Sequence, residues 1–312
     1  MAHSWSRAAP LTDPGNIPII SLYRPLTESG FGLEIANTDL ARPDELVMKE
    51  VLEAFHNSGG LIIIRNQEHI DPYHLCQFVK MFGDLEKNEK YDSQFLVPGY
   101  PEILRNGNSK KAEKYSALFI EADSPPLLWH MDDSFRNPQP IGSCMFCVHT
   151  PPEGGETGFA GMTAAYEALP KSIKNHIESI QTIHSYNYLN EQLRIKNPHR
   201  PRLSKQLQKQ IPSVKRPLVA THPETKKKCL YLPLCHIESV IGIEDSESKP
   251  LLNNLLDHAI SDSFAYMHSW MPGDVVVWDN RCTLHAPTPF DHNRYERLMY
   301  RLTFLGDQIL GS

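Results

Sequence analysis

Apolar and polar residues follow two different periods in the N-terminal third of the chain. Apolar residues at helical spacing predict a helix that begins at Pro43-Asp44-Glu45 and ends at Gly59-Gly60, and a second helix that Asp71-Pro72 caps. Between them, the apolar run Leu61–Arg65 predicts a buried strand, and the alternation over Gly32–Ile35 predicts another strand. This third of the chain therefore combines helices with strands.

From about residue 120 onward, short apolar runs separated by turn residues predict a series of strands. The predicted strands are Leu127–Met131, Gly142–His149, Lys228–Leu232, Phe264–Trp270, Val275–Trp278 and Leu298–Leu305. Two helical patterns interrupt them, one from Thr163 to about Ser179 and one over Lys249–Ile260. Pro272-Gly273-Asp274 predicts a turn. Helices followed by many short strands predict an α+β fold, with helices flanking a β-sandwich or jelly roll.

The chain has no internal repeat and no low-complexity segment. Residues 1–28 are polar and contain proline, so we expect an irregular N-terminal lead-in with at most one short strand at Ile19–Leu22. We expect residues 29–312 to form a single domain.

Composition and charge narrow the class of protein. The 312 residues are 40% hydrophobic and 22% charged, which is typical of a globular protein with a sizeable core. The net charge of −6 argues against a nucleic-acid binder, and no apolar run approaches the roughly 18 residues of a membrane span. The N-terminus has no apolar signal-peptide region, and the six cysteines are scattered, so we expect reduced thiols in a cytoplasmic protein. Cys144 and Cys147 lie in a strand-like run and are interpreted as core residues.

The segment 192–216 differs from the rest of the chain in charge. It contains eight Lys or Arg residues and no Asp or Glu. Two interpretations stay open. The segment is either a solvated surface, or a lid-like insertion that raises the local potential for an anionic ligand.

Five His-x-acid pairs occur in the sequence, and such pairs are frequent among metal ligands. They are His69/Asp71, His130/Asp132, His176/Glu178, His222/Glu224 and His236/Glu238. In the first, Asp71 is better explained as a helix cap; the third lies within a predicted helix, where residues two apart diverge. The fourth is interpreted as an exposed turn because Pro223 and three lysines accompany it. The fifth cannot be dismissed on local grounds.

The pair His130/Asp132 has the most favourable context for a metal site. On a strand the two side chains share one face, while Trp129 and Met131 pack on the other. His285, which follows the predicted strand ending at Trp278, offers a third ligand. Two imidazoles and one carboxylate on one face of an octahedron suit non-heme Fe(II), which uses the open positions to activate O₂.

Two arginines of interest, Arg297 and Arg301, follow His285 in the sequence. Arg297 and Arg301 share one face of the predicted strand Leu298–Leu305, so both guanidinium groups would point into the same interior. Buried arginines are costly without anions, which predicts an anionic ligand nearby.

Taken together, these motifs resemble the taurine dioxygenase / 2,4-dichlorophenoxyacetate dioxygenase family of Fe(II)- and 2-oxoglutarate-dependent oxygenases. The motifs occur in the family's order, from about Gly32 to Asp307. They are Trp129-His130-x-Asp132-x-Ser134-Phe135, Gly154-Gly155-Glu156-Thr157, Ala164-Ala165-Tyr166-Glu167-Ala168-Leu169, Gly273-Asp274, Trp278-Asp279-Asn280-Arg281, His285, Arg297 and Arg301.

The resemblance implies both a fold and a site. The fold is a double-stranded β-helix, or jelly roll, in which His130, Asp132 and His285 bind iron. Thr157 and Arg297 would bind the distal carboxylate of 2-oxoglutarate, and Arg301 would lie close to the co-substrate and substrate anions, or serve as the partner of a carboxylate. The spacing from His285 to Arg297 is one residue longer than in the family's prototypes, and the taurine enzyme's substrate contacts are not recognisable upstream of Trp129.

The expected activity is oxidation of an unactivated C–H bond in a small organic acid, a carboxylate or sulfonate, with O₂ consumed and succinate and CO₂ released. Hydroxylation is the default outcome, and desaturation or ring closure would use the same ligands. The alternatives are a Zn²⁺-dependent hydrolase on the same three ligands and a catalytically silent jelly-roll binding protein. We expect neither nucleic-acid nor membrane binding, and the sequence leaves open whether the chain forms a homo-oligomer.

Overall fold

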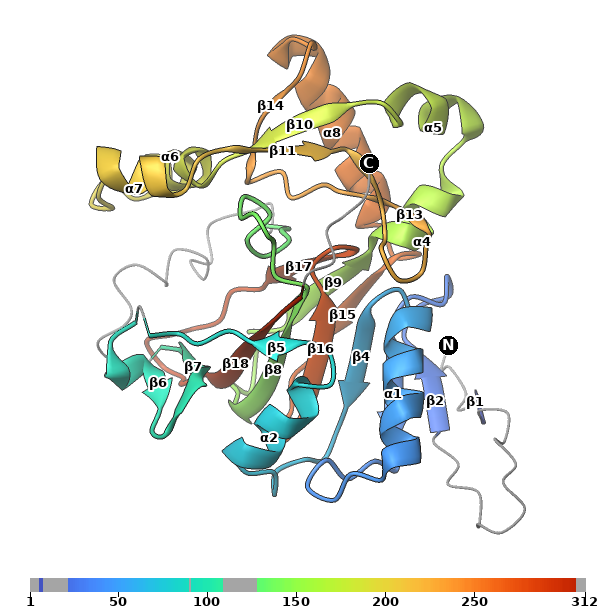
Figure 1. Ribbon diagram of the computed structural model, residues 1–312, viewed down its shortest axis with the longest axis vertical. Coiled ribbons are helices and arrows are strands. Elements are labelled where there is room, and N and C mark those ends of the chain that lie inside the picture. The colour runs from blue at the N-terminus through green and yellow to red at the C-terminus, as the bar shows by residue number, and fades with distance from the viewer. Residues whose placement is uncertain (1–5, 8–21, 90, 109–127, 307–312) are drawn as a thin grey trace.

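A ten-stranded, mostly antiparallel sheet forms the base of the structure. The computed structural model describes residues 6–7, 22–89, 91–108 and 128–306 (Figure 1). The large sheet has the order β1-β2-β3-β4-β16-β8-β18-β7-β6, with β5 paired to β18. Its strands are β1 (Ser6–Arg7), β2 (Leu22–Pro25), β3 (Leu33–Ala36), β4 (Leu61–Ile64), β5 (Asp84–Leu85), β6 (Leu96–Val97), β7 (Tyr100–Gly107), β8 (Gly142–His149), β16 (Val275–Asp279) and β18 (Leu298–Leu305). Only the β3–β4 pairing is parallel among these described pairs.

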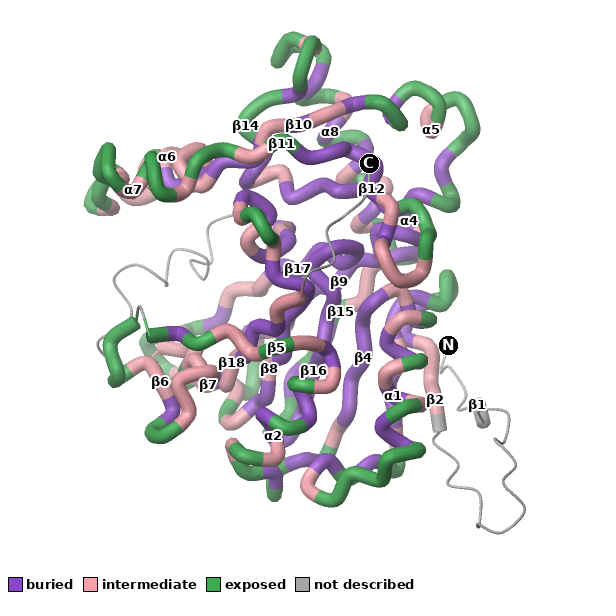
Figure 2. Tube along the Cα trace, in the orientation of Figure 1, coloured by how far each residue is buried: buried purple, intermediate pink, exposed green. Residues whose placement is uncertain are grey.

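Two helices cover one face of the large sheet. They are α1 (Glu45–Asn57) and α2 (Pro72–Val79), whose first turns are capped by the side chains of Asp44 and Asp71. Successive residues of β4 and β16 alternate between two hydrophobic clusters, one beneath these helices and one on the opposite face. The central strands are therefore buried on both faces, as the purple segments of Figure 2 show.

A second, smaller sheet packs on the opposite face. It contains β15 (Ala265–His268), β9 (Thr157–Gly161) and β17 (Thr283–Pro287), in that order. Phe159 of β9 packs with Trp278 of β16 in the cluster between the two sheets, with ring centroids 5.5 Å apart. The space between the sheets holds the residues of greatest chemical interest.

A cap of shorter elements lies beyond the small sheet. Its strands are β10 (Gln181–His184), β11 (Val214–Pro217) and β14 (Ile237–Val240), which form one sheet, and the paired β12 (Val219–Thr221) and β13 (Lys228–Leu230). Its helices are α4 (Met162–Ala168), α5 (Lys171–Ile177), α6 (Tyr186–Lys196), α7 (Lys205–Gln210) and α8 (Asp245–Ala259), and a short 3-10 helix, η1 (Ser93–Phe95), lies elsewhere, beside β6. In Figure 1 the cap forms the upper part of the molecule, opposite α1 and α2.

Several predicted elements are confirmed. Both N-terminal helices and their caps are present, and β8 and β18 have the predicted bounds. The helix expected from Thr163 to about Ser179 is instead two helices, because the chain is extended at Leu169 and Pro170. The helix expected at Lys249–Ile260 begins earlier, at Asp245.

Other predictions need correction. The strand expected at Leu127–Met131 is, within the described residues, a single bridge between His130 and His285. The lead-in expected to be irregular contains β1 and β2, which extend the large sheet through β3; residues 19–21 of the expected Ile19–Leu22 strand lie outside the described residues. The described helices include none with the length and apolar character that crossing a membrane requires.

Gly107 gives a test of how tightly β7 packs against β18. A Cβ at this position would lie 1.9 Å from the carbonyl oxygen of Arg297 and 3.1 Å from Leu298 Cα. We expect Gly107→Ala to lower the free energy of unfolding by about 2 kcal/mol, measured by urea denaturation, because the two backbones must separate. Gly99→Ala is the control: it has open space around it, and its φ of +82° adds only conformational strain, about 1 kcal/mol. Equal losses in the two variants would contradict the close packing.

Candidate metal centre

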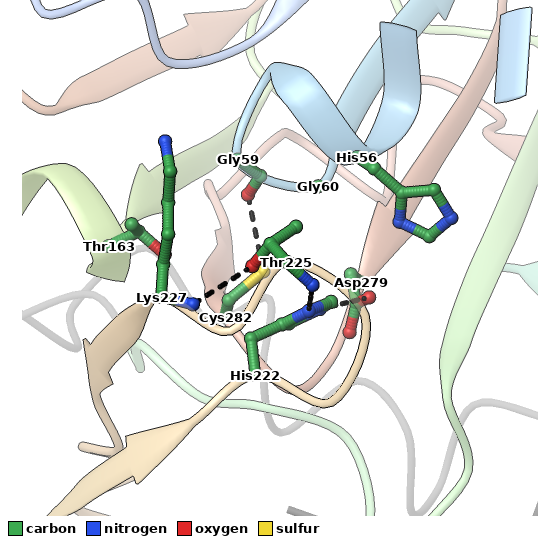
Figure 3. A pocket seen from close by; sticks show the side chains of 9 residues that line it. All are labelled: His56, Gly59, Gly60, Thr163, His222, Thr225, Lys227, Asp279 and Cys282. Atoms are coloured by element: carbon green, nitrogen blue, oxygen red, sulfur yellow. Dashed lines mark hydrogen bonds and ion pairs between the residues drawn. The ribbon is translucent and has the colours of Figure 1, made fainter. Parts of the chain in front are cut away.

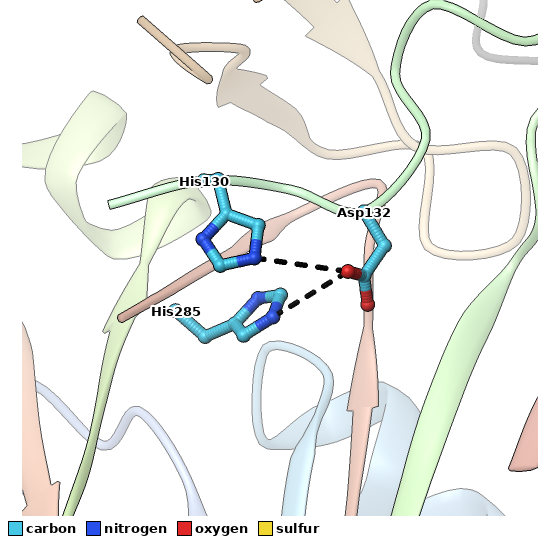
Figure 4. Close-up of side chains that lie close together, drawn as sticks. All are labelled: His130, Asp132 and His285. Carbon is cyan, nitrogen blue, oxygen red and sulfur yellow. Dashed lines mark ion pairs between the residues drawn. The ribbon is translucent and has the colours of Figure 1, made fainter. Parts of the chain in front are cut away.

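Three side chains predicted as metal ligands come together between the two sheets. Nε2 of His130 and Nε2 of His285 each lie 3.7 Å from Oδ1 of Asp132 (Figure 4). The two imidazole rings lie with centroids 4.1 Å apart, because the backbones of the two histidines exchange hydrogen bonds of 2.9 and 2.8 Å. One carboxylate oxygen thus faces two imidazole nitrogens across a gap longer than a hydrogen bond.

A turn brings Asp132 into this position. Its successor, Asp133, has a φ of +52°, and the chain turns there, with the Arg136 N–H donating to the Asp133 carbonyl at 2.8 Å. The alternation of side chains along a strand, from which the pair His130/Asp132 was predicted, is therefore the wrong reason for their proximity. His130 is held on the bridge, with its Nδ1 2.9 Å from the Leu128 carbonyl oxygen, so Nδ1 carries the proton and Nε2 presents a lone pair.

The second oxygen of Asp132 is occupied by protein groups. The Ser143 hydroxyl donates to Oδ2 at 2.9 Å, and the guanidinium of Arg301 lies 2.8 Å from the same oxygen. Burial raises the pKa of Asp132, but the guanidinium of Arg301, helped by the Ser143 hydrogen bond, outweighs this effect and holds that pKa below its usual value. Asp132 is therefore a carboxylate with its free oxygen directed at the histidines.

His285 lies on β17 and packs against aromatic side chains of two other strands. Its ring lies 4.9 Å from that of Trp278 and 6.3 Å from that of Phe159, and burial lowers its pKa well below the usual value. Nδ1 of His285 is buried without a hydrogen-bond partner among the described residues. Two neutral imidazoles and one carboxylate form a donor set that suits a divalent transition metal.

A second group of side chains gathers around Arg297. Its guanidinium lies 5.9 Å from the centroid of the Trp270 ring, and the indole N–H of Trp270 donates to Thr157 Oγ1 at 2.9 Å. Burial lowers the pKa of Arg297 to about 10, and its Nε has no hydrogen-bond partner among the described residues. A Cβ on Gly155 would approach Arg297 Cδ to 3.4 Å, so the glycine lets this loop lie close. Arg297 is a partly buried cation that has no anionic partner among the described residues.

The two arginines that were expected to share one face differ in their partners. Arg301 is paired with Asp132, whereas Arg297 precedes β18 and donates its backbone N–H to Asn108 Oδ1 at 2.8 Å. The register of the β18–β8 pairing shifts between Leu298 and Met299, and this irregularity lies between the two arginines in the sequence. The geometry of Arg301 matches the interpretation of a carboxylate partner that the sequence left open.

The comparisons with known proteins agree with one another. Residues 22–303 match the family model described as "Taurine catabolism dioxygenase TauD, TfdA family". The chain belongs to the TauD/TfdA family. It is therefore an enzyme, a dioxygenase.

Individual relatives cover nearly the whole chain. The (S)-phenoxypropionate/alpha-ketoglutarate-dioxygenase of Sphingobium herbicidovorans is 30% identical over 293 residues, which cover 90% of this chain and 93% of that enzyme. The alpha-ketoglutarate-dependent 2,4-dichlorophenoxyacetate dioxygenase of Cupriavidus pinatubonensis is 30% identical over 263 residues, covering 83% and 89%. The crystal structure of AAD-2 in complex with Mn(II) and N-oxalylglycine has a TM-score of 0.72 and 26% identity, and covers 94% of this chain and 98% of that chain.

The other His-x-acid pairs of this TauD/TfdA dioxygenase have different surroundings. Asp71 caps α2, as expected, and the turn residue His222 is buried rather than exposed, with Nε2 3.0 Å from Asp279 Oδ2. The prediction of an exposed turn is wrong for His222, because its imidazole pairs with the buried carboxylate of Asp279. His236 lies next to the candidate centre, but its Nδ1 is 2.8 Å from the hydroxyl of Ser134.

Several residues of this dioxygenase that support the centre were not predicted. Ser143 and Asn280 bind Asp132, and Trp270 links Thr157 to Arg297. A serine in an apolar strand and an Asn after Trp278-Asp279 are visible in the sequence as polar residues at buried positions. Nothing in the sequence specifies their partners.

The basic segment 192–216 includes the C-terminal part of α6 and all of α7, which extend from the cap (Figure 1). Its arginines are not all solvated: Arg216 is buried and donates to the Ser134 carbonyl at 3.2 Å, and Arg194 is paired with Glu191. The exposed cations include Arg202, Lys205, Lys209 and Lys215. The segment is thus anchored beside the metal-site turn at one end and carries exposed positive charge along its length.

Proposed function

We propose that this enzyme is an Fe(II)- and 2-oxoglutarate-dependent dioxygenase that oxidises a C–H bond of a small anionic substrate. In this proposal His130, Asp132 and His285 bind the metal, and Arg297 with Thr157 binds the distal carboxylate of 2-oxoglutarate. The two facing sheets would be the double-stranded β-helix that the sequence resemblance implies. The relatives named as alpha-ketoglutarate-dependent enzymes support the same co-substrate.

The observation that carries the proposal is the guanidinium of Arg297, whose Nε is buried and which has no anionic partner among the described residues, in the same interior as the metal-type triad. Burying an unpaired charge is costly, so this position is explained by a carboxylate that arrives with a ligand. The Thr157 hydroxyl accepts the Trp270 indole N–H and keeps its own proton available for donation to the same carboxylate. A diacid with one end on a metal and the other on Arg297 fits both features.

Each residue has a defined task in this scheme. O₂ is the oxidant in this scheme: iron, when bound, would activate it, and 2-oxoglutarate would supply two of the four electrons as it becomes succinate and CO₂, with the substrate supplying the other two. Asp132 offers Oδ1 to the metal because Ser143 and Arg301 occupy its Oδ2. Arg297 orients the co-substrate through a planar, bidentate contact. The aromatic residues around His285 exclude water from the metal site.

Charge favours an anionic substrate. A divalent metal, Arg297 and Arg301 outweigh the single carboxylate of Asp132 by three charges, and the 2-oxoglutarate dianion removes two of them. A monoanionic substrate would neutralise the last. Nε of Arg301 is buried without a partner among the described residues, so this side chain has a donor left for such an anion. We propose the segment 192–216, with its exposed cations, as the cover over this site.

Family membership favours an oxygenase over the two alternatives from the sequence, a Zn²⁺ hydrolase and a silent binding protein. Under anaerobic conditions, Fe(II) and 2-oxoglutarate together should give a weak visible charge-transfer band, because the co-substrate chelates the iron. Asp132→Ala should abolish the band and succinate release, whereas Asp133→Asn, which changes the neighbouring carboxylate paired with Arg136, should retain both. A wild-type protein without the band would exclude the proposed reaction.

Arg297→Lys tests the co-substrate pocket. Lysine keeps the charge but loses the planar fork, so the KM for 2-oxoglutarate should rise at least about tenfold, equivalent to about 1.4 kcal/mol, and more than the KM for the prime substrate. Arg294→Lys is the control, since Arg294 is an exposed residue beside Tyr295. An unchanged KM for 2-oxoglutarate would remove Arg297 from the pocket and leave Arg301 as the alternative.

The substrate charge is tested by comparing small carboxylic and sulfonic acids with their methyl esters or amides. Acids should support faster succinate release than the neutral analogues, and the difference should shrink at high salt, because the Debye length falls from about 10 Å at 0.1 M to about 3 Å at 1 M. Succinate formation is measured for each matched pair at both salt concentrations. Neutral analogues that work as well as the acids would rule out an anion subsite and leave Arg301 solely as the partner of Asp132.

A further inference from the structure

A second cluster of potential metal ligands lies outside the candidate iron centre. His222, Asp279 and Cys282 each offer a ligand atom, and these atoms all lie within 4.8 Å of one another. They line a small cavity between the end of α1 and the turn that joins β16 to β17, together with His56 (Figure 3). All three residues are buried, and this cluster and the iron centre are the two such groups among the described residues.

The local structure orients the donors toward one another. The Thr225 N–H donates to Nδ1 of His222 at 3.2 Å, which leaves Nε2 to face Asp279 Oδ2 at 3.0 Å. Cys282 follows Asp279 by three residues, and its Sγ lies 3.3 Å from the Gly59 carbonyl oxygen. A Cβ on Gly60 would lie 2.7 Å from Asp279 Cβ and 2.9 Å from Cys282 Sγ, so only glycine lets the end of α1 close over this pair.

The fourth donor is His56, in the last turn of α1. Its Nδ1 is buried without a hydrogen-bond partner among the described residues, although it lines the same cavity. Burial lowers the pKa of His56, so its imidazole is neutral and has a lone pair to offer. An unpartnered imidazole nitrogen beside a His, an Asp and a Cys indicates a missing ligand rather than a simple packing arrangement.

The charges of the cluster accommodate a divalent cation. Asp279 is paired with Arg281, which also contacts Glu224 at 3.0 Å. Burial raises the pKa of Cys282 well above its usual value, so the thiol keeps its proton unless a cation replaces it. With a thiolate at Cys282, the two carboxylates and the thiolate balance the guanidinium and one divalent ion.

We propose that His222, Asp279 and Cys282 form a binding site for Zn²⁺ or a similar thiophilic cation, separate from the iron centre, with His56, which lies outside this close group, turning in as the fourth, tetrahedral ligand. Mixed imidazole, carboxylate and thiolate donors in a closed site are typical of zinc. Binding releases one proton from Cys282 Sγ, while the Nε2 proton of His222 moves to Nδ1, which lies 3.3 Å from Glu224 Oε2 and gives up its bond from the Thr225 N–H. The ion would join α1 to the start of β17, three residues before His285, and so would stabilise the strand that carries this histidine.

Cobalt(II) distinguishes this site from the iron centre, because only a thiolate ligand gives an intense sulfur-to-Co(II) charge-transfer band in the near ultraviolet, and the iron centre contains no cysteine. The metal-free full-length protein is titrated with Co(II) and then with Zn²⁺. We expect the band to saturate with one equivalent, to persist in Asp132→Ala, which disables the iron centre, and to disappear when Zn²⁺ is added.

Cys282→Ser should abolish the band. Cys229→Ser is the matched control, because Cys229 is a buried neighbour whose Sγ instead donates to the Arg281 carbonyl at 3.4 Å, and it should retain the band. His222→Gln gives the same test with all thiols present and should weaken the band or remove its tetrahedral d–d intensity. A wild-type protein without a sulfur band at saturating Co(II), or a band that survives in Cys282→Ser, would overturn the proposal.

Discussion

The carboxamide of Asn280 is the contact on which the geometry of the metal centre depends. Its oxygen accepts from the Asp132 N–H at 3.2 Å and from the Trp278 indole at 3.0 Å, and its nitrogen donates to Ser143 Oγ at 3.2 Å. Ser143 in turn binds the Asp132 carboxylate. Because Asp132 lies on a turn without a strand ladder, these bonds take the place of the ladder. Leaving such a buried amide unpaired would cost about 1–3 kcal/mol, so the turn is fixed to β16 and β8.

The sequence predicts those parts of the fold in which local pattern and tertiary environment agree. The strands β8 and β18 are largely apolar runs and have the predicted bounds, and Asp44 and Asp71 cap the helices that their positions indicate. The strand β9 was not predicted, because its sequence Thr157–Gly161 is rich in glycine and is shaped by close approach of neighbours such as Trp129. The burial of His222 was also not predicted, because its partner Asp279 is distant in sequence.

Arg297, which precedes β18, and Arg301, which lies on it, have guanidinium groups in different electrostatic surroundings. Arg301 is compensated by Asp132 within the protein, which keeps the ligand carboxylate ionised before any ion binds. Among the described residues the guanidinium of Arg297 has the face of the Trp270 ring as its partner and no anion, and burial lowers its pKa. The sequence predicts both as a pair on one face, but their roles separate through the register shift at the start of β18, which no local pattern indicates.

The metal-site turn is also tied to the cap, and the direction of its hydrogen bonds can be derived. Thr182 donates its hydroxyl proton to the Arg216 carbonyl, so it accepts from Nε2–H of His184. Nδ1 of this neutral histidine then accepts from Ser134, which accepts in turn from Nδ1–H of His236. Burial lowers the pKa of both histidines, that of His236 to about 3, so the chain of bonds stays in one direction at neutral pH. Two of the proposed ligands, on the turn and on β17, are therefore positioned by different parts of the molecule. A change in the cap would therefore reach the Asp132 turn through the hydrogen bonds of Ser134.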